Sequence, residues 1–185
     1  MAKPLPSPTV VHTVVFDFDG VFTDNKVWVD QRGGESVRCD RSDGLAFDLI
    51  RAYVRREGLR CEFFILSKEP NPVVLARAQK LGLDCHHGIR DKLAFLQEDL
   101  HRRFPDERTP LEGVVYLGND LNDLRVMRRA GYTVAPADAH PRVQEVAHLV
   151  LEQRGGEGFV RAFVEQWLGI DRMSLEELDE LVSDS

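Results

Sequence analysis

Short apolar runs along the chain alternate with stretches in which apolar residues recur every three or four positions. Such runs are typical of strands buried on both faces, and the longer spacing is typical of helices with one buried side. The predicted strands cover residues 10–16, 61–66, 84–86, 113–117, 132–135 and 149–151. The predicted helices cover residues 43–57, 71–82, a segment opened by Asp91, 121–130 and 158–168.

Between the first strand and the first helix, residues 26–30 and 35–39 form two further short runs joined by a Gln-Arg-Gly-Gly turn, which predicts a β-hairpin. The remaining order of strand then helix predicts an α/β, Rossmann-like parallel sheet with helices on both faces. We expect one domain over residues 10–170, with a disordered lead-in at 1–9 and an acidic C-terminal tail at 171–185 of weak amphipathic helix character.

Composition narrows the class of protein. The chain has 185 residues, of which 43% are hydrophobic and 30% charged, as is ordinary for a soluble globular domain. A net charge of -7 argues against a general binder of nucleic acid or of anionic membranes, since both need a basic surface. No apolar run approaches the roughly 20 residues of a membrane span. The three cysteines are an odd number without close spacing, which fits reduced thiols and predicts a cytoplasmic protein.

The most informative stretch is VVFDFDGVFT at residues 14–23. It places Asp17 and Asp19 at the end of an apolar strand and directly before Gly20. Aspartate is disfavoured in strands, and two close carboxylates raise each other's pKa or recruit a cation. The stretch therefore predicts a metal-assisted site at the carboxyl end of the first strand.

The ends of the other predicted strands carry related chemistry. Parallel sheets place their ligands beyond the carboxyl ends of the strands, so these residues are expected to meet. They supply a hydroxyl, two lysines and a second acidic cluster: Ser67, Lys68, Lys92, Asn119, Asp120 and Asp123.

This set resembles the haloacid dehalogenase superfamily of phosphotransferases. The resemblance is carried by DFDGV at 17–21, Ser67, Lys92 and GNDLND at 118–123, all in the order and strand context of that family. The early hairpin, RSDG at 41–44, SKEPNPVV at 67–74, DKL at 91–93 and PADAHP at 136–141 are similar to its capless branch. That branch contains 3-deoxy-octulosonate 8-phosphate phosphatase and the phosphatase-like C-terminal domain of acylneuraminate cytidylyltransferases.

The resemblance implies a role for each residue. Asp17 would attack phosphorus and form an aspartyl-phosphate, and Asp19 would act as general acid and then general base. Ser67 would hydrogen-bond the transferring phosphoryl group. Lys92 would neutralise charge on Asp17 and the phosphate, with Asp123 orienting it.

The same resemblance implies Mg²⁺ held by Asp17, the backbone carbonyl of Asp19 and either Asn119 or Asp120. Relatives often carry aspartate where Asn119 stands, so the third ligand is open between these two residues. Substrate binding is expected from three further residues: Asp43, Gly44 and Lys68.

The implied function is hydrolysis of a phosphate monoester on a small sugar, such as an octulosonate or nonulosonate phosphate. With no cap domain, the hairpin of a neighbouring subunit would cover the site, which implies a homotetramer. Glu157 stands where the resembling families have an arginine that can reach substrate. The alternative is a non-catalytic oligomerisation or regulatory module, and a phosphomutase or phosphotransferase is a third, weaker interpretation.

Overall fold

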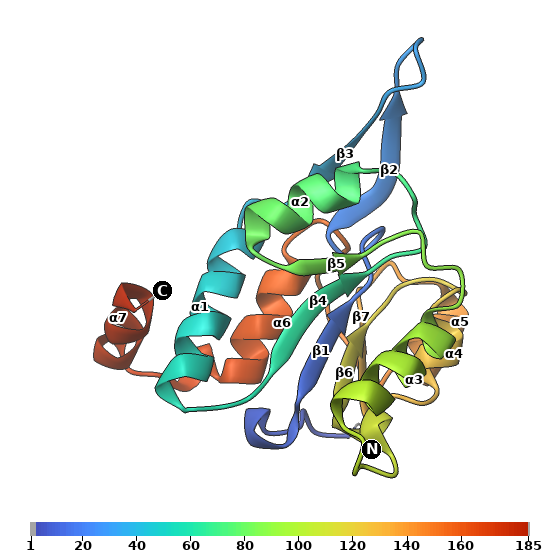
Figure 1. The fold of residues 1–185 in the computed structure, drawn as a ribbon. Coiled ribbons are helices and arrows are strands. Elements are labelled where there is room, and N and C mark those ends of the chain that lie inside the picture. Colours follow the sequence, from blue (N-terminus) through green and yellow to red (C-terminus); the bar gives the residue numbers. More distant parts are fainter. Residues whose placement is uncertain (1–2, 185) are drawn as a thin grey trace.

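A parallel sheet of six strands forms the centre of the computed structural model, which describes residues 3–184 (Figure 1). The strands lie in the order β5-β4-β1-β6-β7-β8, and every neighbouring pair is parallel. Their bounds are β1 Thr13–Phe16, β4 Glu62–Leu66, β5 Asp84–His86, β6 Val114–Leu117, β7 Tyr132–Ala135 and β8 Leu149–Val150. The predicted α/β fold is confirmed.

Helices cover both faces of this sheet. One face carries α1 Asp43–Arg56, α2 Val73–Leu81 and α6 Phe159–Leu168. The other face carries α3 Lys92–Arg103, α4 Leu124–Met127 and α5 Pro141–Val146. Short 3-10 helices lie at Pro8–Val10, Pro110–Gly113 and Ile170–Arg172.

Strand β1 shows why its sequence is apolar from Val14 to Phe16. Val14 and Phe16 pack into the core beneath α1 and α6, whereas Val15 packs into the core beneath α3 and α4. Side chains of a strand alternate between its two faces, so a strand covered on both sides needs apolar residues throughout. After this apolar run, the next polar position comes where the strand leaves the core, at Asp17.

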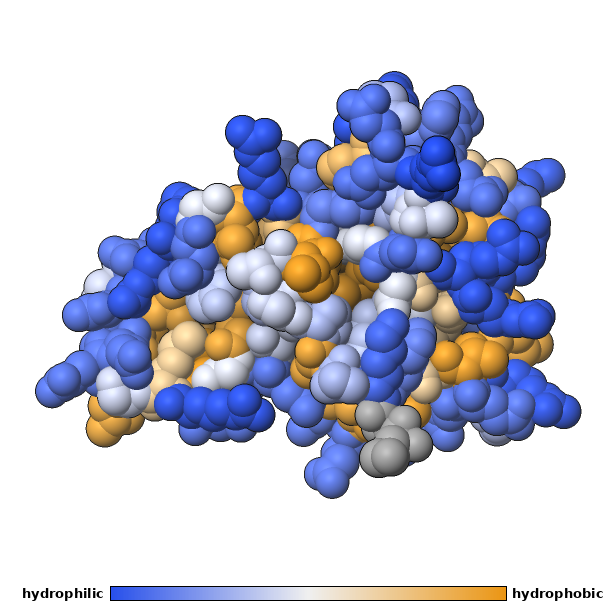
Figure 2. All heavy atoms as spheres, turned by 90° about the horizontal axis from the view of Figure 1, so that it is seen from below, coloured by the Kyte–Doolittle hydropathy of each residue, from blue (hydrophilic) through white to orange (hydrophobic). Residues whose placement is uncertain are grey.

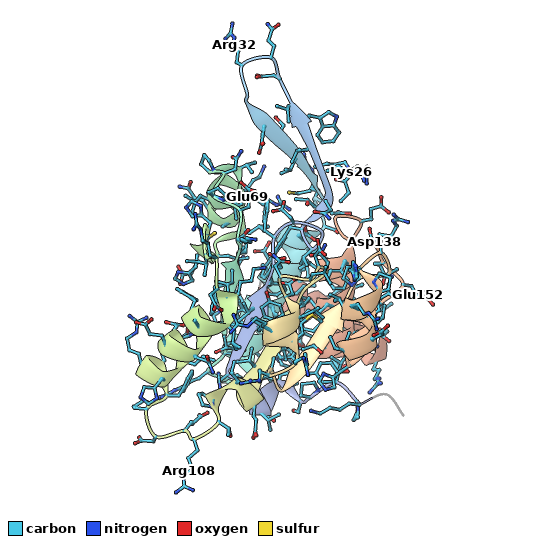
Figure 3. The ribbon with its side chains drawn as sticks, turned by 90° about the vertical axis from the view of Figure 1, so that its right-hand side faces the viewer. Lys26, Arg32, Glu69, Arg108, Asp138 and Glu152 are labelled. Atoms are coloured by element: carbon cyan, nitrogen blue, oxygen red, sulfur yellow. The ribbon has the colours of Figure 1, made fainter. Side chains whose placement is uncertain are left out.

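The predicted hairpin forms a separate two-stranded antiparallel sheet of β2 Thr23–Val29 and β3 Glu35–Cys39. It projects from the end of the molecule at which β1 finishes, with Arg32 at its tip in Figure 3. Three adjacent apolar side chains on β2 are more than half exposed: Val27, Trp28 and Val29. From the hairpin the described chain passes directly into α1, with no inserted cap domain between β1 and α1.

Two predicted elements are shorter than their apolar runs suggested. Val10 belongs to a 3-10 turn that Ser7 begins with its hydroxyl, and it is 66% exposed, so β1 starts only at Thr13. The predicted helix 121–130 is an α-helix only over α4, because a turn joining Asp123 to the carbonyl of Asp120 takes up its start.

The two terminal segments are held by specific contacts. In the predicted disordered lead-in, the carbonyl of Lys3 accepts from Tyr132 Oη at 2.8 Å and the carbonyl of Pro6 accepts from Trp167 Nε1 at 3.0 Å. A hollow of about 690 Å³ lies beside this segment, at the end of the molecule away from the hairpin. Figure 2 shows that end, where apolar patches lie between charged side chains.

The acidic tail contains α7 Leu175–Ser183, which begins with a capping box and packs on α1 through the buried side chain of Leu181. Met1, Ala2 and Ser185 lie outside the described residues. Within residues 3–184, the longest apolar helical stretches fall short of what a membrane crossing requires.

Candidate active site

The sheet register brings the predicted residues together. Phe16, the last residue of β1, pairs with Ile65 of β4 on one side and with Leu117 of β6 on the other. The strand order reverses between β1 and β6, since the chain first builds β4 and β5 on one side and then β6 to β8 on the other. Such a switch point opens a crevice beyond the carboxyl ends of the strands, where α/β proteins bind ligands.

A cleft of about 360 Å³ occupies this position. Six of the predicted residues line it: Asp17, Asp19, Ser67, Lys68, Asn119 and Asp120. Four further residues, none of them among the predicted site residues, complete its walls: Asn25, Glu69, Pro70 and Asn122.

Lys92 and Asp123 lie beneath the cleft and not on its wall. The Lys92 ammonium contacts Asp17 Oδ1 at 2.7 Å and Asp123 Oδ1 at 2.8 Å, and its side chain is only 1% exposed. Burial opposes the charge on this lysine, but the two carboxylates outweigh it and raise the pKa of Lys92. The ammonium is therefore a fixed positive charge directly behind Asp17.

Asp123 is surrounded by donors. Its Oδ1 accepts from Lys92 and from Tyr116 Oη at 2.6 Å, and its Oδ2 accepts from the backbone N–H groups of Asn119 at 2.9 Å and Asp120 at 3.2 Å. Burial opposes ionisation, yet these donors together lower the pKa of Asp123. Asp123 thus holds both the lysine and the loop after β6 in position.

The two aspartates of the opening motif differ in environment. Burial and the nearby Asp123 raise the pKa of Asp17 to about 8, although Lys92 acts in the opposite direction. Asp19 is half-buried, and burial together with Glu69 raises its pKa to about 6. Asp17 thus needs a further cation to stay ionised, whereas Asp19 can exchange a proton near neutral pH.

Asn119 has the one polar atom in this cleft that is buried without a partner. Its Oδ1 accepts no hydrogen bond within the described residues. Its amide lies directly against Gly20, where a Cβ would come within 1.9 Å of Asn119 Nδ2. Gly20 has φ +75 and carries no side chain, so it lets Asn119 approach Asp17 and Asp19. A buried orphan oxygen in a carboxylate-lined cleft is the kind of atom that a cation satisfies.

The donor set fits a hard cation. No group of three or more His, Cys, Asp and Glu side chains within residues 3–184 is arranged to hold a metal. The cleft instead offers oxygens from Asp17 and Asn119, and the backbone carbonyl of Asp19 stays the predicted donor beside them. Such mixed oxygen ligands suit Mg²⁺, which usually keeps several waters and takes few protein ligands. Asp120 is exposed and its Oδ1 accepts from the N–H of Leu121 at 2.7 Å, so it is less suited to the third position.

Ser67 and Lys68 follow β4 on the opposite wall. Ser67 is 1% exposed, and its Oγ accepts from the N–H of Glu69 at 3.1 Å, which leaves the hydroxyl proton free to donate into the cleft. Lys68 is exposed and lines the cleft nearer its mouth.

Asp43 and Gly44 are not brought to the cleft wall. Asp43 begins α1, is 1% exposed and pairs with Arg77 of α2 at 3.4 Å. Burial raises its pKa to about 7 despite this cation. In this arrangement Asp43 braces the two helices, and its assignment to substrate binding stays a prediction.

A tight backbone contact joins the C-terminal half of the chain to the loop that follows β1. The N–H of Gly156 donates to the carbonyl of Val21 at 3.1 Å. A Cβ on Gly155 would lie 2.0 Å from the carbonyl oxygen of Gly20, and one on Gly156 would lie 2.5 Å from the backbone of Thr23 and Asp24. Only glycines allow this approach, which fixes the loop that follows Asp19.

Tyr116 is the main residue that sequence reasoning missed. It lies within the apolar strand β6 and is fully buried, so its pattern is that of a core residue. The one feature that could have pointed to the site is its hydroxyl, because a buried tyrosine usually finds a hydrogen-bond partner. Glu69 and Asn25 carried no such signal, since polar residues in loops are common.

Comparisons with known proteins show the family to which the chain belongs. Residues 105–163 match the family model described as haloacid dehalogenase-like hydrolase. The chain is 30% identical over 152 residues to the 3-deoxy-D-manno-octulosonate 8-phosphate phosphatase of Yersinia pestis, covering 82% of this chain and 76% of the relative. It is also 24% identical to N-acylneuraminate cytidylyltransferase A of Danio rerio, covering 94% of this chain but only 38% of that protein.

A solved structure from Streptomyces avermitilis, assigned to the HAD family hydrolases, superimposes with a TM-score of 0.79 at 38% identity and covers 91% of this chain and 97% of that one. The chain therefore belongs to the haloacid dehalogenase-like hydrolases. Within them it is a phosphatase, that is, a phosphoric monoester hydrolase similar to the octulosonate phosphate phosphatases.

Proposed function

We propose that this phosphatase is Mg²⁺-dependent and hydrolyses a small sugar phosphate through an aspartyl-phosphate on Asp17. The observation that carries the proposal is the position of Asp17. Its carboxylate lies at the floor of the cleft, with the Lys92 ammonium 2.7 Å behind it. Asp19 lines the same cleft.

The reaction divides into two displacements. A carboxylate oxygen of Asp17 attacks phosphorus, the bond from phosphorus to the leaving oxygen breaks, and Asp19 gives that oxygen its proton. In the second displacement Asp19 takes a proton from water, whose oxygen attacks phosphorus, and the bond to Asp17 breaks to release inorganic phosphate. Ser67 donates to the phosphoryl group, and Lys92 offsets the negative charge that gathers on Asp17.

Mg²⁺ would be held by Asp17, the carbonyl of Asp19 and Asn119 Oδ1. When bound, it supplies positive charge that keeps Asp17 ionised and neutralises phosphoryl oxygens. The raised pKa of Asp17 and the unpartnered Asn119 oxygen both support this requirement. Between the two candidates for the third ligand, Asn119 is therefore preferred over Asp120.

A keto-sugar acid phosphate, such as an octulosonate or nonulosonate phosphate, is the proposed substrate class. The relative from Yersinia pestis is named for an octulosonate phosphate, and the outer cleft offers polar groups from Asn25, Lys68 and Glu69. Asp43 and Gly44 would act at a distance from the cleft, through the helix that they begin.

The non-catalytic module remains the second candidate because of Glu157. Its carboxylate pairs with Arg38 of the hairpin at 3.1 Å, so this position ties loop to hairpin and offers no cation to a substrate. The intact set of Asp17, Asp19 and Lys92 supports catalysis instead, since assembly alone does not need it.

A homotetramer and a cytoplasmic location complete the proposal. The exposed apolar side chains of β2 suit an interface between copies of the chain, and Cys39, Cys61 and Cys85 are free. A monomer mass in light scattering would contradict the tetramer. Binding to nucleic acid or membranes is not expected from a chain of net charge -7.

Replacing Asp17 by Asn tests the function. We expect Asp17→Asn to lower the rate of phosphate release from 4-nitrophenyl phosphate by about 10³-fold or more, because an amide cannot form the acyl-phosphate. The matched control is Asp106→Asn, an exposed aspartate with no side-chain hydrogen bond or ion pair to any of residues 3–184. A wild-type rate in the purified Asp17→Asn protein would exclude Asp17 as the nucleophile.

A further inference from the structure

The base of the hairpin contains an unusual backbone position. Asn25 has φ +60, and among residues 3–184 it is the one residue other than glycine with a positive φ. Asparagine tolerates this conformation better than most residues, but it is still uncommon and has to be held by its surroundings. An observed outlier of this kind is a reason to look for a function at that position.

Thr23 holds Asn25 in this conformation. The Thr23 hydroxyl is fully buried, and it accepts from the N–H of Gly20 and from the N–H of Asn25, both at 3.1 Å. The pairing of β2 with β3 is irregular between Thr23 and Val27, so Asn25 also escapes the regular ladder. One buried hydroxyl thus ties Asn25 to the loop that carries Asp19.

Asn25 is exposed and lines the same cleft as residues 67–70. In Figure 3, Lys26 marks the base of the hairpin and Glu69 lies at the same level of the molecule. The structure records no hydrogen bond for the Asn25 carboxamide within residues 3–184, although its backbone is fixed. A fixed backbone at a ligand cleft, with an unused donor and acceptor on its side chain, is the arrangement of a recognition group.

We propose that Asn25 is a specificity-determining residue, whose carboxamide hydrogen-bonds hydroxyl groups of the substrate's leaving group. This inference rests on the proposed phosphatase function and adds to it. The deep end of the cleft, with Asp17, Ser67 and Asn119, handles the phosphoryl group. The leaving group must then extend toward the mouth, where Asn25 and Glu69 face it. Neutral and anionic hydrogen-bonding groups there match a polyhydroxylated chain.

The test compares two substrates in one variant. Asn25→Gly removes the carboxamide but keeps the positive φ, which glycine adopts without strain. The substrates are 3-deoxy-D-manno-octulosonate 8-phosphate, which carries hydroxyls, and 4-nitrophenyl phosphate, which has none on its leaving group. We expect Asn25→Gly to lower the ratio of their kcat/KM values about tenfold, the effect of one lost hydrogen bond, with the aryl phosphate value unchanged within twofold.

Lys26→Ala is the control, because Lys26 is the exposed neighbour that does not line the cleft, and it should leave the ratio unchanged. An unchanged ratio in Asn25→Gly would overturn the inference while the phosphatase function stands. Equal losses of kcat/KM on both substrates would assign Asn25 a structural role and would also overturn the inference. Wild-type protein that cleaves only the aryl phosphate would overturn the inference as well. Failure of wild type to cleave either ester would overturn the proposed function itself.

Discussion

Two parts of the cleft hold their charges differently. The floor is Asp17, Ser67 and Asn119 with Lys92 and Asp123 beneath them, and the rim is the exposed part of the cleft wall, which includes Lys68 and Asp120. On the floor, Lys92 and Asp123 are almost fully buried, and Asp123 accepts from four donors. On the rim, Lys68 and Asp120 are exposed, and neither forms an ion pair within the described residues. Buried charges are tolerated only when they are fully paired, so the floor can hardly change without loss of the fold. The rim can vary freely, which suits the part of the site that selects a substrate.

The largest predicted effect comes from removing the buried cation of the floor. Lys92→Met leaves Asp17 and Asp123 buried without their shared cation, and we expect the free energy of unfolding to fall by about 3–5 kcal/mol. Phosphatase activity should fall by about 10³-fold or more. Urea denaturation and phosphate release measure the two effects. Lys68→Met is the rim counterpart, and its stability should stay within about 0.5 kcal/mol of wild type. Equal destabilisation by both variants would remove the distinction between floor and rim.

A comparison of Asp43 with Asp123 shows how much pairing matters for a buried carboxylate. Asp43 is as buried as Asp123, but its ion pair within the described residues is with one cation, Arg77, at 3.4 Å. Its pKa is raised from 3.8 to about 7, whereas that of Asp123 is lowered. The folded chain thus keeps a proton on Asp43 over a pH range in which the unfolded chain has lost it. The stability that this group contributes is therefore present below about pH 4 and is lost as the pH rises through 7.

We accordingly expect Asp43→Asn to gain stability relative to wild type, by about 2 kcal/mol, when the pH is raised from 5 to 8. Denaturant unfolding of both proteins at the two pH values measures this difference. A difference that stays constant with pH would show that Asp43 is ionised throughout, like a residue of the floor.

The smallest predicted effect concerns the proposed third metal ligand, for which Asn119 on the floor and Asp120 on the rim are the two candidates. Asn119→Ala removes the buried unpartnered oxygen, and we expect about tenfold more Mg²⁺ to be needed both for half-maximal activity and for thermal stabilisation. Asp120→Ala removes an exposed carboxylate and should change neither value more than about twofold. Chelation of Mg²⁺ should abolish wild-type activity reversibly. If Asp120→Ala has the larger effect, the third ligand comes from the rim.

The sequence predicted the floor better than the rim. Asp17, Ser67 and Asn119 follow apolar strands, and parallel pairing necessarily brings such strand ends together. Lys92 was predictable only as a member of that set, since a lone lysine in the first turn of a helix is usually exposed. The hydroxyl of Tyr116 could not be assigned, because its contact with Asp123 depends on how the loop after β6 folds back.

Asn25, which lines the cleft near its mouth, escaped prediction for a different reason. The position of Asn25 depends on a backbone angle and on the buried hydroxyl of Thr23, neither of which leaves a periodic pattern. The pairing of Arg38 with Glu157 joins residues 119 positions apart, and neither sequence segment points to the other. Local propensity likewise failed at Val10, where Ser7 and Pro8 begin a 3-10 turn inside an apolar run.

The contact of Gly155 and Gly156 with the backbone of residues 20–24 has a consequence for biosynthesis. The ribosome makes Asp17 and Asp19 early, but the loop that carries Asp19 meets its packing partner only after residue 156 has been translated and β8 has joined the sheet. A nascent chain that ends at β7 already contains every residue of the cleft, yet it lacks the piece that sets their geometry. Catalytic competence is therefore among the last properties that the growing chain acquires.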